Sequence, residues 1–263
     1  MDRSEAYDHD LKLYWALQHM KRLEVEVERW LGGNPYSIDI EFDPERRENA
    51  LWVNPLRPPP ADFSLIIGDC LHNLRSALDS LVYTLAIAKQ GSPLSKDIAK
   101  KVQFPVTKDC DGFRSSKWRI RDIPDGAQAE IEGLQPYNRR QNYARDPLWV
   151  LNELSNIDKH RLPHLTLFAL GATTIGGDAR FSVGRQRESA AVEGRTKLLG
   201  FGARRDDPSR KVNVEFKLEF SIAFKGPVTQ GADVFEILPY IRDDIMNEVL
   251  PRLAQFLPPL PLH

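Results

Sequence analysis

Apolar residues recur at helical spacing through the first thirty residues of the chain. They follow intervals of mostly three and four between Ser4 and Leu31 and stop at Gly32 and Gly33. Their positions are Tyr7, Leu11, Tyr14, Leu17, Leu23, Val27 and Trp30. Because this period places side chains on one face of a helix, it predicts a first amphipathic helix over residues 4–31.

The period of the apolar positions changes to two after these glycines. Tyr36, Ile38, Ile40 and Phe42 alternate with polar residues, and the chain returns through residues 51–53 after a polar turn. Alternation of this kind is typical of a half-buried strand. It predicts a β-hairpin over residues 36–53, ended by the prolines at 58–60.

Helical spacing returns in two further segments of the first 163 residues. Residues 63–90 have Asp62 as a candidate N-cap and Gly91 as a candidate C-terminal stop. Residues 147–160 begin with Pro147, which is tolerated in the first turn because that turn has no use for the missing N–H. The stretch 92–146 between them is rich in loops, and we expect an insertion packed on the core, with a short helix near residues 125–134.

The second half of the chain contains several strand candidates between residues 164 and 225. The clearest is 212–224, in which Val212, Val214, Phe216, Leu218, Phe220, Ile222 and Phe224 share one face by strict alternation. A last amphipathic helix is predicted over 233–256. The sequence therefore predicts an α+β fold, with a mainly helical domain over 1–163 and an antiparallel sheet plus C-terminal helix over 164–263, packed as one globular unit.

Composition and charge narrow the class of protein. The chain has 263 residues, of which 41% are hydrophobic, and a net charge of -1, so a globular protein without a global attraction for nucleic acid or anionic lipid is expected. There is no apolar run near the roughly 18 residues of a membrane span, and no basic and apolar N-terminal signal. Cys70 and Cys110 follow no disulfide or metal spacing. We expect a cytoplasmic protein that does not associate with membranes.

The segment 63–90 carries an unusual polar stripe opposite its apolar face. The stripe contains neither Lys nor Glu between Gly68 and Thr84, and its members are Asp69, His72, Asn73, Ser76, Asp79, Ser80 and Tyr83, with Arg75 at its border. Arg75 and Asp79 stand at i and i+4, a spacing that favours an ion pair. The stripe is therefore either a solvated helix face or part of a fixed polar network.

A second polar face follows on residues 147–160 and the turn after them. Its members are Asn152, Asn156, Asp158, Lys159, His160 and Arg161. We expect the two helices to pack together, with Asp69, His72, Arg75 and Asp79 near Asn152, Asn156, Lys159 and His160. Such a network either fixes the register of the helices or lines a functional pocket.

Several common chemistries find no support in the sequence. His160 and His164 stand four apart, but Pro163 interrupts the helix that would align them, so no metal site is predicted. There is no G-x-S-x-G elbow for a nucleophilic serine and no G-x-G-x-x-G turn for a dinucleotide. We therefore expect no cofactor.

Two segments carry a family resemblance. GDCLHNLRSALDSLVY (68–83) and LNELSNIDKHRLPHL (151–165), together with LQPY (134–137), resemble a group of bacterial, largely actinobacterial, proteins that has no assigned activity. The first segment is also similar to HEPN domains, helical modules that are often metal-independent ribonucleases and whose signature is Arg followed four to six residues later by His. Arg75 matches the arginine, whereas Ser80 stands where the related group has histidine.

The HEPN resemblance implies a phosphate-contacting role for Arg75, with acid–base catalysis assigned to His72 or His160 beside Asp79, and a possible homodimer. Two loops, residues 114–121 and 137–145, interleave arginine with aromatic residues. They are either ordinary solvated loop charges or a surface that binds single-stranded RNA. Because Ser80 replaces the histidine, we expect a non-catalytic binding or interaction module. The alternative is a HEPN-like ribonuclease or another phosphodiester-directed enzyme.

Overall fold

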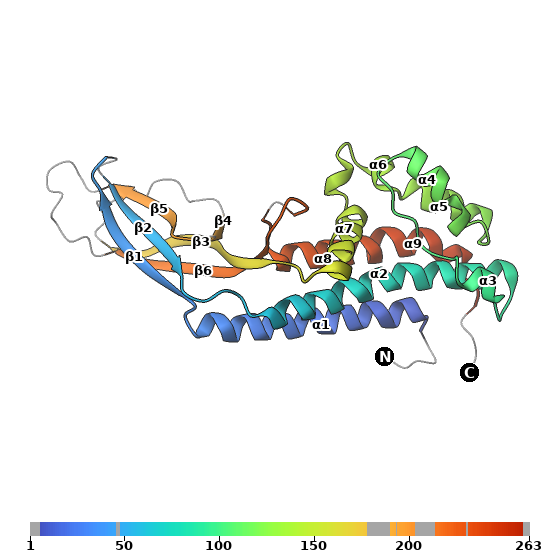
Figure 1. Cartoon of the computed structure of the whole chain (residues 1–263), viewed down its shortest axis with the longest axis horizontal. Coiled ribbons are helices and arrows are strands. Elements are labelled where there is room, and N and C mark those ends of the chain that lie inside the picture. The colour runs from blue at the N-terminus through green and yellow to red at the C-terminus, as the bar shows by residue number, and fades with distance from the viewer. Residues whose placement is uncertain are drawn as a thin grey trace. The chain divides into compact units, whose positions relative to one another are not determined.

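The computed structural model describes residues 6–45, 48–177, 190–192, 194–202, 214–229 and 231–259 (Figure 1). It contains the three long helices that the sequence predicts: α1 (Asp8–Gly32), α2 (Ala61–Gln90) and α7 (Pro147–His160). The first residues of the predicted helix 4–31 lie outside the described residues. The Asp146 carboxylate caps α7 by accepting a hydrogen bond from the Leu148 N–H at 3.0 Å.

The buried face of α1 agrees with the predicted one at Leu23 and Val27 and differs from it nearer the N-terminus. The side chains that α1 buries are Leu13, Ala16, Met20, Leu23 and Val27, whereas Tyr14 and Trp15 are exposed. The buried side chains and the predicted apolar stripe both recur at intervals of mostly three and four. Periodicity alone therefore does not decide between them, and the larger aromatic residues favoured the predicted stripe. The small Ala16 allows a close approach instead, since Cys70 Sγ of α2 lies 3.8 Å from the Ala16 carbonyl oxygen.

The strands form two antiparallel sheets of three strands each, which confirms the α+β class. Their bounds are β1 (Tyr36–Asp43), β2 (Glu48–Pro55), β3 (Leu165–Gly177), β4 (Ala190–Val192), β5 (Thr196–Gly202) and β6 (Val214–Phe224). The strand order is β1-β2-β5 in one sheet and β4-β3-β6 in the other. The predicted hairpin is present, and Val212 of the predicted long strand lies outside the described residues.

The chain divides into two compact units, which differ from the expected division at residue 163. The first unit contains Met1–Leu23, Ser64–Pro163 and Glu236–His263, and the second contains Glu24–Phe63 and His164–Phe235. The hairpin belongs to the second unit because β2 pairs with β5. Residues 236–263 of the C-terminal helical segment belong to the first unit, where Phe256 packs against Gly126 of α5 (Asp125–Gly133).

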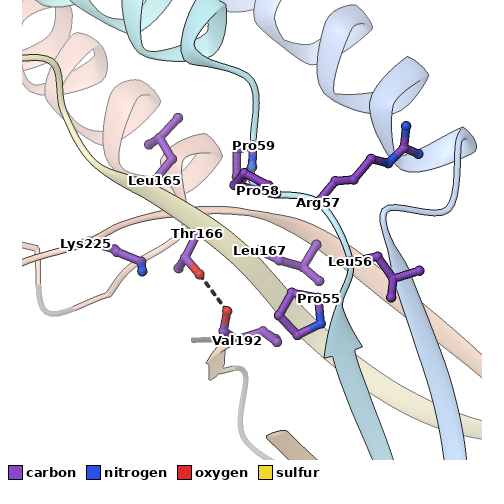
Figure 2. Close-up of a pocket in the computed structure, with 10 residues that line it drawn as sticks. All are labelled: Pro55, Leu56, Arg57, Pro58, Pro59, Leu165, Thr166, Leu167, Val192 and Lys225. Atoms are coloured by element: carbon purple, nitrogen blue, oxygen red, sulfur yellow. Dashed lines mark hydrogen bonds between the residues drawn. The ribbon is translucent and has the colours of Figure 1, made fainter. Parts of the chain in front are cut away.

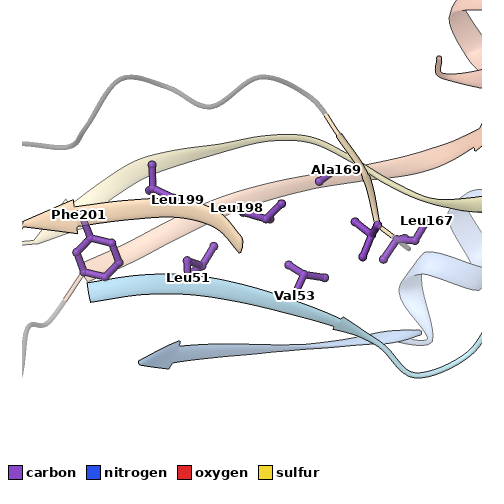
Figure 3. Close-up of a cluster of buried hydrophobic side chains, with 8 residues drawn as sticks. Leu51, Val53, Leu167, Ala169, Leu198, Leu199 and Phe201 are labelled. Carbon is purple, nitrogen blue, oxygen red and sulfur yellow. The ribbon is translucent and has the colours of Figure 1, made fainter. Parts of the chain in front are cut away.

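The second unit has its own hydrophobic core between the two sheets. Figure 3 shows residues of β2, β3 and β5 that contribute to it. The buried members are Leu51, Val53, Leu167, Ala169, Val192, Leu198, Leu199 and Phe201. Tyr36 of β1 packs at the margin, with its ring 4.0 Å from that of Phe220.

The first unit is built on the apolar face of α2. That helix fully buries Ile67, Leu71, Leu74, Leu78, Leu81 and Leu85, at helical spacing as predicted. The stretch 92–146 covers this core with the short helices α3 (Lys96–Ala99), α4 (Cys110–Ser116), α5 (Asp125–Gly133) and α6 (Pro136–Arg139). It buries Phe104, Phe113, Ile120 and Ile131, as expected of an insertion packed on the core.

The C-terminal helix is continuous but changes type. It consists of α8 (Val234–Asp244), a π-helical turn (Ile245–Val249) and α9 (Leu250–Leu253). The Leu250 N–H bonds to the Ile245 carbonyl, five residues back, so Pro251 follows directly after a widened turn. None of the helices in the described ranges combines the length and the apolar character that crossing a bilayer requires.

The two cysteines differ in reactivity. Cys70 is fully buried on α2, and burial raises the pKa of its thiol to about 12, whereas Cys110 is exposed. Because only the thiolate reacts, we expect Cys70 to react at least about a thousandfold more slowly than Cys110 at pH 8. Titration with a chromogenic disulfide reagent checks this: one thiol reacts in the native protein and two in denaturant. Equal rates for both thiols in the native protein would contradict the packing of α2 against α1.

Candidate functional site

Arg75 lies at the centre of the first of two polar clusters on α2. Its Nη2 donates to Asp79 Oδ1 at 3.1 Å and to the Phe104 carbonyl oxygen at 2.5 Å. The Phe104 N–H in turn donates to Asp79 Oδ1 at 3.0 Å. The predicted ion pair of Arg75 and Asp79 is therefore formed. Both of its members also bond to the backbone of Phe104, in the stretch that follows α3.

A second arginine, Arg119, is near enough for its charge to act on Arg75. Its guanidinium carbon lies 5.4 Å from the centroid of the Trp118 ring, and 47% of the Trp118 surface is exposed. Burial lowers the pKa of Arg75, the charge of Asp79 opposes that shift, and the charge of Arg119 adds to it. Two positive charges thus act on each other close to a single carboxylate.

Both guanidinium groups keep unused hydrogen-bond donors. Only 11% of the Arg75 side chain is exposed, and its buried Nη1 has no partner among the described residues. The buried Nε of Arg119 has none there either. Buried donors are normally satisfied, and guanidinium groups bind carboxylates and phosphates through parallel hydrogen bonds. An anion bound to these donors would satisfy them and offset the repulsion between the two positive charges. We call Arg75, Asp79, Trp118 and Arg119 the paired-arginine site.

The second polar cluster lies nearer the N-terminus of α2, where that helix meets α7. A Cβ at Gly68 would lie 2.5 Å from Asp158 Oδ1, so only glycine permits this approach. Burial raises the pKa of Asp158, the charge of Asp69 adds to the shift, and His72 opposes it. His72 Nε2 also lies 3.4 Å from Ser76 Oγ. The charge of His72 therefore acts on Asp158 of α7. Arg75 instead bonds to Asp79 of its own helix and to the backbone of Phe104.

The remaining predicted site residues are spread over the surface of the first unit. Asn73 donates to the Asp69 carbonyl of its own helix, and Asn152 donates to its neighbour Glu153. The exposed members of the α7 face are Asn156, Lys159, His160 and Arg161. Helices α2 and α7 meet at Gly68 and Asp158, with Asp69 and His72 close by. The contacts of the described residues do not include the expected ones to Asn152, Asn156, Lys159 and His160, because Asn152 bonds to Glu153 and the other three side chains are exposed.

The two arginine-rich loops have different structural roles. Loop 114–121 supplies Arg119 and Trp118 to the paired-arginine site, so the structure brings this loop to Arg75. In loop 137–145, Arg139 is buried and bound to acidic residues from two other segments: Nη2 donates to Asp146 at 2.7 Å and Nη1 to Asp244 at 2.8 Å. Arg139 is therefore committed to holding the fold.

Sequence reasoning missed this Arg139 network because its members are distant along the chain. Asp244 is separated from Arg139 by 105 positions and lies where α8 meets the π-helical turn. The one local signal is Asp146 directly before Pro147, which indicates an N-cap and says nothing of a second partner. Burial raises the pKa of Asp244, and the hydrogen bonds from Arg139 oppose that shift.

The second unit contains a cavity of about 240 Å³, and its lining includes none of the predicted site residues (Figure 2). Its lining is Pro55, Leu56, Arg57, Pro58, Pro59, Leu165, Thr166, Leu167, Val192 and Lys225. Two polar side chains of the lining are engaged in hydrogen bonds within the protein. Arg57 Nη2 donates to the Gly33 carbonyl at 2.6 Å, and Thr166 Oγ1 donates to the Val192 carbonyl at 2.7 Å. The cavity offers aliphatic surface rather than a set of convergent polar groups.

No family model, curated protein or solved structure matches this chain, so the site is argued from its own geometry.

Proposed function

We propose that the protein is a non-catalytic binding module that holds a phosphate-bearing ligand, with single-stranded RNA as its ligand class, at the paired-arginine site. The observation that carries the proposal is the pair of buried, unpartnered donors on Arg75 and Arg119. A phosphate oxygen is a strong acceptor that suits guanidinium groups in a fixed geometry. A bound phosphate would complete the site.

RNA is favoured among phosphate ligands by what surrounds the two guanidinium groups. Trp118 presents an exposed indole beside Arg119, and aromatic faces of this kind stack bases in a sequence-tolerant way. The same loop carries the exposed side chains of Lys117 and Arg121, which extend the positive charge along a backbone path. The other arginine-rich loop contributes less, because Arg139 is buried in its own network.

A binding role is favoured over catalysis by the positions of the histidines. General acid–base catalysis requires a group within hydrogen-bond reach of the reacting proton. His72 acts on Asp158, His160 is exposed on α7, and Ser80 occupies the position of the HEPN histidine. The ribonuclease hypothesis, with Arg75 and either His72 or His160, stays the alternative, and it rests on the resemblance. The cytoplasmic location and the homodimer also stay predictions.

Fluorescence anisotropy with a labelled single-stranded RNA of about twelve nucleotides tests the proposal. We expect saturable binding by the wild type, and an affinity reduced about tenfold or more for Arg119→Gln, since one charge-assisted phosphate contact contributes roughly 1.5–3 kcal/mol. Trp118→Ala should lose about fivefold or more through stacking.

Arg114→Gln is the matched control, because Arg114 lies on the same segment, pairs only with Asp111 among the residues described, and is well exposed. Its affinity should stay within about threefold of wild type. Equal losses for both arginine variants would show general electrostatic attraction and contradict a specific site. Gel analysis of the same RNA tests the alternative: cleavage by wild type that disappears in His72→Ala or His160→Ala would replace binding by catalysis.

A further inference from the structure

Strand β1 exposes a row of apolar side chains on the face that it shares with the core of the second unit. Ile38 and Ile40 stand opposite the buried Val53 and Leu51 of β2. Ile38, Ile40 and Phe42 are nevertheless 41%, 50% and 39% exposed. The apolar face of this sheet therefore extends past the buried core onto β1, the end strand, whose apolar side chains are only partly covered.

The outer edge of β1 is open to further strand pairing. The strand order β1-β2-β5 places β1 at one end of its sheet, and no described strand pairs with its second side (Figure 1). The paired region is eight residues long, from Tyr36 to Asp43, and contains no proline. An edge of this length presents alternate backbone N–H and C=O groups, which an extended peptide can satisfy by adding a strand.

The other face of β1 is acidic. Asp39 and Glu41 alternate with the apolar row, and Asp43 continues the series. Two basic groups reach this face: Arg195, directly before β5, bonds Glu41 at 2.5 Å, and Lys197 of β5 lies 2.7 Å from Glu48 of β2 and 3.6 Å from Asp43. Asp39 accepts a hydrogen bond from Asn54 at 2.6 Å, and Arg195 is the cation that acts on both Asp39 and Glu41 among the described residues. Two carboxylates thus face one cation at these two positions of β1, which leaves them with excess negative charge.

This charge pattern discriminates between possible partners. A second copy paired antiparallel about Ile40 would place Asp39 opposite Glu41 of the other copy at both ends of the contact, and like charges directly opposite each other are destabilising. A strand that alternates apolar with basic residues would instead cover the apolar row and neutralise Asp39 and Glu41. We propose that β1 is a docking edge for an extended peptide segment in which apolar residues alternate with lysine or arginine.

Two labelled nine-residue peptides test this inference, one alternating valine with lysine and one alternating valine with glutamate. We expect the lysine peptide to bind the wild type about tenfold or more tightly than the glutamate peptide, and the double variant Asp39→Lys/Glu41→Lys to reverse that preference. Asp97→Lys, at an exposed aspartate on α3, is the control for positive charge added elsewhere on the chain and should keep the wild-type preference. A lysine peptide with N-methylated alternate amides should lose binding, because it cannot form the strand ladder.

Because the double variant could unfold, Ile40→Asp provides a second test. It keeps the backbone edge of β1 but removes an apolar contact, so the affinity for the lysine peptide should fall at least about fivefold. The inference is overturned by a lysine peptide that binds the wild type no better than the glutamate peptide, by N-methylation without effect, or by self-association of the wild type through β1.

Discussion

Arg139→Met is expected to lower the free energy of unfolding by about 3–5 kcal/mol. Arg139 is 13% exposed and lies between two carboxylates that are almost fully buried, Asp146 and Asp244. Replacing the guanidinium removes the nearest cation from both carboxylates. Arg140, whose Nε lies 3.9 Å from Asp146 Oδ2, is the cation that then remains near them among the described residues. Removal of one member of a buried ion pair has costs in this range. Chemical denaturation monitored by circular dichroism measures the change.

Two further variants separate lost charge from lost packing. Arg145→Met, in the same segment but exposed, should change stability by less than about 0.5 kcal/mol. Adding Asp244→Asn to Arg139→Met should recover part of the loss, because the second substitution removes one of the two buried negative charges. If Arg139→Met unfolds at the same denaturant concentration as wild type, the buried network does not hold α6, α7 and α8 together.

The second large effect is expected at Asp79. Asp79→Ala removes the acceptor of Arg75 Nη2 and of the Phe104 N–H, and it leaves Arg75 buried beside Arg119 with no carboxylate among its described neighbours. We expect a loss of about 3 kcal/mol in unfolding free energy. Thermal and chemical denaturation of purified variants measure it.

The repulsion between Arg75 and Arg119 predicts a specific stability for the double variant Asp79→Ala/Arg119→Gln. Arg119→Gln added to Asp79→Ala should restore about 1 kcal/mol, since it removes the second positive charge. Asp69→Ala is the matched control on the same helix: Asp69 is exposed and its charge disfavours ionised Asp158, so its removal should cost nothing measurable. Strict additivity of Asp79→Ala and Arg119→Gln would contradict direct interaction at the paired-arginine site.

The sequence predicts what depends on local spacing. Helices α2 and α7 and the hairpin begin and end within two residues of their expected bounds, because caps, prolines and glycines act over a few positions. The ion pair of Arg75 and Asp79 is predictable for the same reason. The apolar face of α1 is not, because two stripes share one period and only the small Ala16, in contact with α2, selects the buried one.

Long-range partners are what the sequence does not predict. Arg119 reaches Arg75 from more than forty residues away, and the Arg139 network joins three segments of the first unit. The alternation in β1 predicts a strand correctly, yet it gives no information on whether a second layer covers Ile40. In each case the missing fact is which distant segment lies opposite, and that is settled by packing rather than by local pattern.

Nuclear magnetic resonance of arginine side chains, with inorganic phosphate added at constant ionic strength, tests the central claim most directly. The account predicts that the Nε–H resonance of Arg119 shifts and saturates, that Asp79→Ala or Arg75→Met alters this response, and that the Arg114 resonance stays in place. A weak, unsaturable shift common to Arg119 and Arg114, or no shift at all, would contradict an anion-binding site at the paired arginines.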